Sequence, residues 1–256
     1  MMAEVGFMAG HSKWANIKHR KARVDAKRGS QWSKCARAII VAAKSGGGDP
    51  DKNISLRYAI DEARAVNMPK DTIVNAIKKG TGELAGESYE SIVYEGYGPK
   101  GVAMMLEILT DNRNRTAGEI RKIFETGGGN LGGSGCVSYL FEPKGQIFVA
   151  KDGADEEIIM EISLEAEAED IIDDGESWQI ISAPQDYIGL RETLESAGLT
   201  VGLAQITQIP STTVKCTGDA ARKVINIVEA LEDHDDVQKV HANFDIPDEE
   251  MVALNS

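Results

Sequence analysis

The chain has 256 residues, enough for two or three compact domains, and a formal net charge of −13. Its longest apolar run, Ala38–Ala43, is far shorter than the roughly 20 residues that cross a bilayer, and no signal-like segment precedes Lys13. The three isolated cysteines form no CxxC pair and fit no disulfide framework, which indicates a reducing, cytoplasmic location.

Positive charge is concentrated at the start of the chain. Residues 1–82 carry 16 Lys/Arg and 7 Asp/Glu, a net charge of +9, whereas the other 174 residues carry 12 and 34, a net charge of −22. An acidic chain that gathers its cations at one end predicts a polyanion-binding end, because the remainder repels the same ligand. Nucleic acid is the expected partner, and an acidic protein surface is the weaker alternative.

Three helices are predicted in the first third of the chain. The segments 30–44, 54–66 and 71–79 each place apolar residues on one face, and glycine or proline follows each of them. They predict a small helical domain over residues 8–82. The residues before about Asp25 lack apolar periodicity, so they are expected to form a basic arm that is mobile or partly helical.

The pattern changes after Gly82 to mixed strands and helices. Strands are predicted at 91–97, 102–110 and 136–141, with a helix at 116–125 that Thr116 and Glu119 cap, and a glycine-rich loop at 127–135. Near the end, strands at 212–216 and 237–244 flank a helix at 219–231. These segments predict a split α+β domain over residues 83–144 and 209–253.

The intervening residues have an order of their own. Strands at 146–150, 170–172, 178–182 and 200–207 alternate with helices at 154–166 and 185–197 in the order β-α-β-β-α-β, which is typical of ferredoxin-like folds. The predicted fold class is therefore α+β. A helical N-terminal domain is followed by two α+β domains, of which the ferredoxin-like one, residues 145–208, is inserted in the other.

The basic arm is the first candidate site. Its cations stand among small or polar residues with few acids, whereas solvated charge runs usually mix signs, so the run favours phosphate binding. Trp14 or His19 offers a ring for base stacking, although a single aromatic does not make a stacking platform. The predicted contact residues are Lys13, Trp14, Lys18, His19, Arg20, Lys21, Arg23, Lys27 and Arg28.

A second candidate site lies between a predicted strand and a predicted helix, in the run DNRNRT at 111–116. Its side chains Asn112, Arg113, Asn114 and Arg115 could hold a phosphate with help from the helix amides. In the alternative interpretation the segment is an ordinary loop, in which the arginines pair with nearby acids such as Glu107. The sequence favours neither.

Catalytic chemistry is not indicated. The glycines at 127, 129 and 132 match G-x-G-x-x-G, but a helix is predicted before the run and a strand after it, opposite to a dinucleotide site. The acidic clusters lack the EF-hand layout, and the histidines lack zinc-ligand spacing. We therefore expect no cofactor, no metal, no small-molecule substrate and no enzymatic activity. A protein-interaction scaffold would leave the basic arm unexplained.

Several motifs together resemble one family. The runs AGHSKWANIKHRKARVDAKRG at 9–29, GGGDPDKN at 46–53, NMPKDTI at 67–73, YEGYGPKG at 94–101, DNRNRT at 111–116, GGGNLG at 127–132 and IPST at 209–212 are similar to the YebC/PmpR family. The resemblance implies three domains, one helical and two α+β. It also implies that the basic arm and the DNRNRT loop are nucleic-acid contact sites.

The same resemblance implies a function. The family is described as probable transcriptional regulators, some of which bind promoter DNA, while its mitochondrial relatives are translational activators and bacterial relatives are linked to stalled ribosomes. We expect a non-enzymatic, nucleic-acid-binding regulator of gene expression that acts on DNA. The alternative is a translation factor that binds ribosomal RNA.

Overall fold

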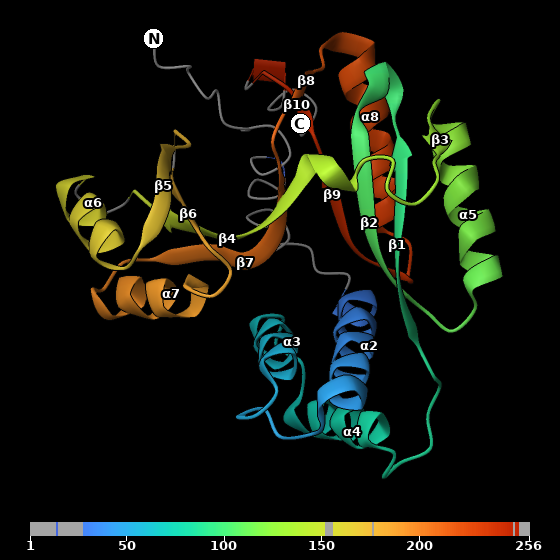
Figure 1. Ribbon diagram of the computed structural model, residues 1–256, viewed down its shortest axis with the longest axis horizontal. Helices are drawn as coiled ribbons and strands as arrows, with labels where there is room; N and C mark the ends of the chain where they lie inside the picture. The colour runs from blue at the N-terminus through green and yellow to red at the C-terminus, as the bar shows by residue number, and fades with distance from the viewer. Residues whose placement is uncertain (1–13, 15–27, 152–155, 176, 248, 251–256) are drawn as a thin grey trace. The chain divides into compact units, whose positions relative to one another are not determined.

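The computed structural model describes residue 14 and residues 28–151, 156–175, 177–247 and 249–250 (Figure 1). The described chain falls into two compact units. One unit contains residues 28–136 and 219–240. The other contains residues 137–218, apart from the undescribed positions, together with Trp14 and the described residues from 241 onward.

The helical segment of the first unit consists of α2 (Arg28–Gly46), α3 (Ile54–Ala65) and α4 (Lys70–Thr81). Their apolar faces form one core in which Ile39, Leu56 and Ala63 are fully buried. Asn53 caps α3, because its side-chain oxygen accepts a hydrogen bond from the Leu56 N–H at 3.1 Å. The three helices predicted from apolar periodicity are confirmed.

A four-stranded sheet completes this fold in the order β3-β1-β2-β9. Strands β1 (Glu90–Tyr97) and β2 (Ala103–Thr110) are antiparallel and are joined through the 3-10 turn η1 (Pro99–Gly101). Strand β3 (Asn130–Leu131) pairs with β1, and β9 (Val237–Ala242) borders β2. Helices α5 (Arg113–Thr126) and α8 (Gly218–Glu232) are close neighbours, since a Cβ at Gly127 would lie 2.0 Å from Ile227.

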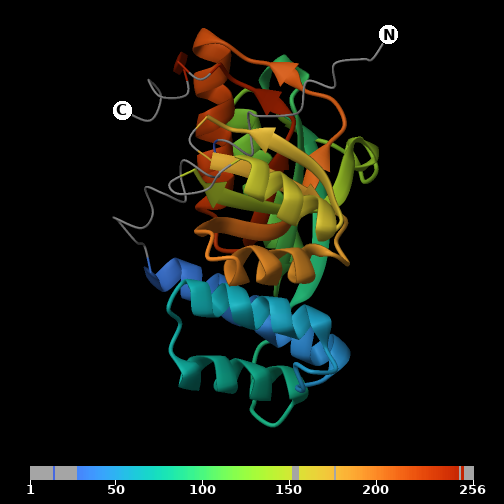
Figure 2. The same ribbon diagram turned by 90° about the vertical axis from the view of Figure 1, so that its left-hand side faces the viewer.

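The second unit contains the predicted β-α-β-β-α-β order, which is confirmed: β4 (Phe141–Ala150), α6 (Glu156–Glu165), β5 (Ala168–Asp173), β6 (Ser177–Ser182), α7 (Tyr187–Ser196) and β7 (Val201–Pro210). The sheet has the order β5-β6-β4-β7, and α6 and α7 lie on the same face of it (Figure 2). The fully buried side chains of Ile147, Ile180 and Leu194 form part of its core. Strands β8 (Val214–Lys215) and β10 (Phe244–Asp245) form a separate parallel pair.

The strand predicted at 136–141 is wrong. Residues 138–140 form the 3-10 turn η2 (Ser138–Leu140), and regular pairing begins only at Phe141. The apolar alternation of this segment is misleading because Tyr139 is 74% exposed while Val137 is fully buried. The chain passes here from one unit to the other, so the side chains do not line one face of a sheet.

None of the helices in the described part of the chain is long and apolar enough to cross a membrane.

Candidate nucleic-acid interface

Most of the basic arm lies outside the described residues, namely Lys13, Lys18, His19, Arg20, Lys21, Arg23 and Lys27. Arg28 is the first residue of α2, so the arm joins the helical core directly. Trp14 is described, and its side chain is 2% exposed. Its ring is therefore covered in this structure and is not presented for stacking on a base.

The DNRNRT run forms the junction between β2 and α5. Asn112 is the N-cap: its side-chain oxygen accepts a hydrogen bond from the Arg115 N–H at 3.2 Å, and the Asn112 N–H donates to Oγ1 of Thr110 at 2.9 Å. The helix therefore begins at Arg113. The predicted capping box at Thr116 and Glu119 is wrong, because Asn112, four residues closer to the strand, supplies the cap.

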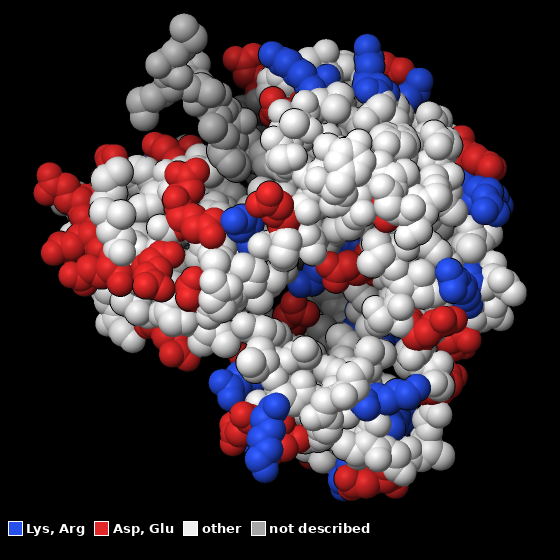
Figure 3. All heavy atoms as spheres, in the orientation of Figure 1, with Lys and Arg blue, Asp and Glu red and all other residues white. Residues whose placement is uncertain are grey.

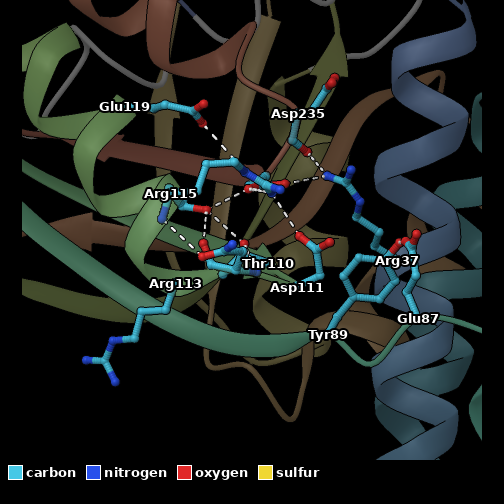
Figure 4. Close-up of polar contacts among 12 residues, drawn as sticks. Arg37, Glu87, Tyr89, Thr110, Asp111, Arg113, Arg115, Glu119 and Asp235 are labelled. Atoms are coloured by element: carbon cyan, nitrogen blue, oxygen red, sulfur yellow. Dashed lines mark hydrogen bonds and ion pairs between the residues drawn. The ribbon is translucent and has the colours of Figure 1, made fainter.

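Asp236, in the turn between α8 and β9, is the centre of a polar cluster that joins three segments. Figure 4 shows two of its partners, Arg37 and Arg115. Asp236 is buried, with 2% of its surface exposed. The Thr116 hydroxyl donates to Oδ2 of Asp236 at 2.7 Å, and Nη2 of Arg115 donates to the same oxygen at 3.0 Å. Nη1 of Arg37, on α2, reaches the other carboxylate oxygen at 3.1 Å. Helices α2 and α5 are thus both bound to one buried carboxylate.

The ionisation of Asp236 follows from these contacts. Burial by itself would raise the pKa of this carboxyl, but hydrogen bonds from Thr116, Arg115 and Thr110 and the charge of Arg37 outweigh it, so the pKa lies below its ordinary value. The pKa of the Arg115 guanidinium is raised by hydrogen bonds to Asp236 and Asp111. Both groups are charged at neutral pH.

The contact between α2 and the α8–β9 turn extends beyond the carboxylate. Nζ of Lys34 donates to the Glu232 carbonyl oxygen at 2.5 Å, and Arg37 also donates to the carbonyl oxygen of Asp235. The guanidinium of Arg37 lies 5.4 Å from the centroid of the Tyr89 ring, a cation–π contact. Two basic residues of α2 are therefore structural. The sequence gives no local signal for this role, because their partners lie about 200 positions away.

The two interpretations of the DNRNRT run each apply to some of its residues. Arg115 is paired with acids, but with Asp111 at 2.8 Å and Asp236 rather than with Glu107. Arg113 is exposed and points away from the cluster (Figure 4), and its guanidinium makes no ion pair with any residue that the structure describes. Asn114 is also exposed. Arg113 and Asn114 are thus available to a ligand, whereas Asn112 and Arg115 hold the junction together.

The glycine-rich loop is tied to β1. The buried side chain of Glu95 accepts a hydrogen bond from the Gly135 N–H at 2.7 Å, and the Glu95 carbonyl oxygen accepts one from the Gly132 N–H at 2.8 Å. The hydroxyl of Tyr97 donates to the Cys136 carbonyl oxygen at 2.8 Å. A Cβ at Gly129 would lie 2.4 Å from the Tyr97 carbonyl oxygen, so this glycine permits a close backbone approach.

More than half of the net negative charge that follows residue 82 lies in the ferredoxin-like segment. Residues 145–208 carry 2 Lys/Arg and 15 Asp/Glu, a net charge of −13 that equals the formal charge of the whole chain. On the face drawn in Figure 3, acidic side chains gather over α6 and β5. The field of this segment repels polyanions.

Nucleophilic or metal chemistry has little support in the described residues. No group of three or more His, Cys, Asp or Glu side chains there could hold a metal ion. Burial, with a smaller effect of the Glu62 charge, raises the pKa of the Cys35 thiol to about 11, and burial also raises that of Cys136. Thiols with such pKa values are poor nucleophiles at neutral pH.

Comparison with known proteins identifies the family. Residues 12–83 match the TACO1/YebC protein N-terminal domain, and residues 89–244 match the TACO1/YebC second and third domain. A probable transcriptional regulatory protein of Natranaerobius thermophilus is 56% identical over 244 residues, covering 94% of this chain and 98% of the relative. One from Persephonella marina is 55% identical over 241 residues, covering 93% of this chain and 96% of the relative.

A solved structure agrees with the fold. The crystal structure of a conserved hypothetical protein from Aquifex aeolicus has a TM-score of 0.82 and 50% sequence identity, covering 92% of this chain and 98% of that one. The resemblance seen in the sequence motifs is confirmed. The chain belongs to the TACO1/YebC family.

Proposed function

We propose that this protein is a non-enzymatic regulator of gene expression that binds DNA through its basic N-terminal segment, in the cytoplasm. The observation that carries the proposal is the separation of charge: a net +9 over residues 1–82 against −13 over residues 145–208. A polyanion is attracted to the first segment and repelled by the second. The names of the relatives, probable transcriptional regulatory proteins, agree with this function.

The residues that would contact phosphates differ in their availability. Within the helical domain, Lys34 and Arg37 already bind the α8–β9 turn, so these two residues are not available to phosphates. At the junction, Arg113 is exposed while Arg115 is paired with two acids. We therefore propose that the arm residues Lys18, Arg20, Lys21 and Arg23 supply most of the affinity, and that Arg113 adds to it.

Ribosomal RNA is the second candidate target. The arm has many cations and one aromatic ring that is buried, which favours binding to a phosphate backbone over hydrogen bonding to base edges. Proteins that recognise structured RNA rely on backbone shape in the same way. A role in translation would use the same arm.

Crosslinking in cells tests the proposal and separates the two targets. The tagged full-length protein is crosslinked, and the recovered DNA and RNA are both sequenced. The comparison proteins are Lys18→Ala/Arg20→Ala/Lys21→Ala/Arg23→Ala and a control with equal charge loss at exposed positions, Lys70→Ala/Lys78→Ala/Lys79→Ala/Lys215→Ala. Promoter peaks that only the arm variant loses would support the proposal. Ribosomal RNA lost in the same way would support the second candidate, and equal recovery with both variants would refute the role of the arm.

A further inference from the structure

Helix α5 has an exposed face that the fold does not use. Its buried side consists of Thr116, Ile120 and Phe124. On the opposite side, Asn114, Gly118, Arg121 and Lys122 recur at spacings of three and four residues, and all four are exposed. We call these four residues the α5 face.

The cations of the α5 face are not neutralised by neighbours. Neither Arg121 nor Lys122 forms an ion pair within the described part of the chain. The nearest acid toward the start of the helix, Glu119, is instead 3.0 Å from Nε2 of His234 and 4.0 Å from Nε of Arg115. Glu125 is exposed one turn beyond Arg121 and limits the positive surface at that end.

Gly118 is unusual at the centre of this face. It lies in the interior of α5, where glycine destabilises a helix relative to alanine. A Cβ at this position would have no atom within 4 Å, and its φ is not in the left-handed region. Neither packing nor backbone conformation therefore requires glycine here. What glycine does provide is a helix surface without a side chain, which another backbone can approach closely.

We propose that the α5 face is a second contact surface for a phosphodiester backbone, in which Arg121 and Lys122 bind phosphates and Gly118 lets the strand lie against the helix. Arg113, which is also exposed, extends the α5 face at the N-terminal end of the helix. The distance from Asn114 to Lys122 along the axis is about 12 Å, at roughly 1.5 Å per residue. This length corresponds to three or four nucleotides of one duplex strand, at about 3.4 Å each.

The inference rests on the proposed function and deepens it, because it adds a surface that is separate from the basic arm. An acidic protein partner fits this face less well, since acidic side chains on a protein are spaced irregularly and are accompanied by bulky groups that gain nothing from a bare glycine. A phosphate backbone presents one charge at every nucleotide.

The experiment measures binding of the full-length protein to two fluorescent duplexes of about 20 base pairs, one DNA and one RNA of the same sequence, between about 50 and 200 mM salt. Arg121→Ala/Lys122→Ala is compared with Arg222→Ala/Lys223→Ala, an adjacent exposed pair on α8 in which Lys223 is already bound to Asp219 at 2.9 Å. The two variants lose equal charge.

For the α5 variant, the slope of log affinity against log salt should decrease in magnitude by about 1.4–1.8, since each lost phosphate contact removes about 0.7–0.9. The α8 variant should keep most of the wild-type slope. Gly118→Gln should lower the affinity at fixed salt without any change in charge, and Gly118→Ala, which adds a single methyl group, should lower it less. The duplex whose slope changes more identifies the preferred backbone.

The experiment distinguishes a failure of the proposed function from a failure of the α5 inference. If the wild-type protein binds neither duplex, the proposed function fails and the inference fails with it. If the wild type binds and the Lys18/Arg20/Lys21/Arg23 variant does not, while Arg121→Ala/Lys122→Ala keeps the wild-type slope, only the α5 inference is overturned. Equal loss from the α5 and α8 variants would mean that overall charge, not this face, determines binding, and would also overturn it.

Discussion

Replacing Asp236 with alanine should destabilise the unit that contains α2, α5 and α8. Asp236 is 2% exposed, and its carboxylate accepts hydrogen bonds from Thr116 at 2.7 Å and from Arg37 at 3.1 Å. Removing one partner of a fully buried charge pair costs about 3–5 kcal/mol. Because the Arg37 side chain is 19% exposed and water can solvate its charge after the substitution, we expect the lower end, about 3 kcal/mol.

This loss corresponds to a decrease in Tm of about 6–12 °C for a chain of this size. The assay is thermal and denaturant unfolding followed by the fluorescence of Trp32, whose indole N–H donates to the Val66 carbonyl oxygen at 3.1 Å. A shared background with Trp14→Phe and Trp178→Phe restricts the signal to this unit. Asp235→Ala is the control, since its carboxylate is exposed and one residue away.

The contribution of Asp236 to the free energy of unfolding should decrease as the pH falls below about 4. Its pKa is lower in the folded protein than the value of about 3.9 in an unfolded chain, so the stabilisation is fully present above that value and is lost as the pH falls through the folded pKa. The stability difference between wild type and Asp236→Asn should be constant near neutral pH and shrink below about pH 4. A difference below about 1 kcal/mol for Asp236→Ala, or one that grows in acid, would refute the argument.

Three further substitutions or modifications test other parts of the fold. Asn53→Ala should destabilise the helical domain by about 1–2 kcal/mol in chemical unfolding, because it removes the cap of α3 and leaves two partly buried carbonyl oxygens without their amide donor. Cys35, with a pKa near 11 from burial and the Glu62 charge, should be alkylated at pH 8 more than about tenfold slower in the folded protein than in denaturant, measured by mass spectrometry. Gly118→Ala should stabilise the protein by about 0.5–1 kcal/mol; destabilisation would show that this glycine is structural.

The elements that the sequence predicts well are those determined by local periodicity. Apolar residues at helical spacing predict α2, α3 and α4, and the turn signals after residue 145 predict the complete β-α-β-β-α-β order. The boundaries are less accurate where two local signals compete. Thr116 and Glu119 have capping-box spacing, but Asn112 lies closer to the end of β2 and caps the helix instead.

The polar cluster could not be predicted in the same way. Asp236 belongs to the run EDHDD at 232–236, which reads as a solvated acidic turn. Its burial depends on Arg37 and Thr116, which are 199 and 120 positions away in the sequence. A single sequence contains no local signal for such a contact. The same is true of the ion pair between Arg115 and Asp236, although the second acid bound to Arg115, Asp111, lies only four residues before it.

The Asp236 cluster also has a consequence for binding. It joins α2, where the basic arm ends, to α5, which presents the proposed second surface, within one compact unit. Two weak contact surfaces held in a fixed relation act at a high effective concentration toward the same ligand. Asp236→Asn, measured well below its Tm, should therefore bind nucleic acid more weakly at fixed salt although both surfaces are intact. Wild-type affinity in this folded variant would mean that the arm and the α5 face bind independently.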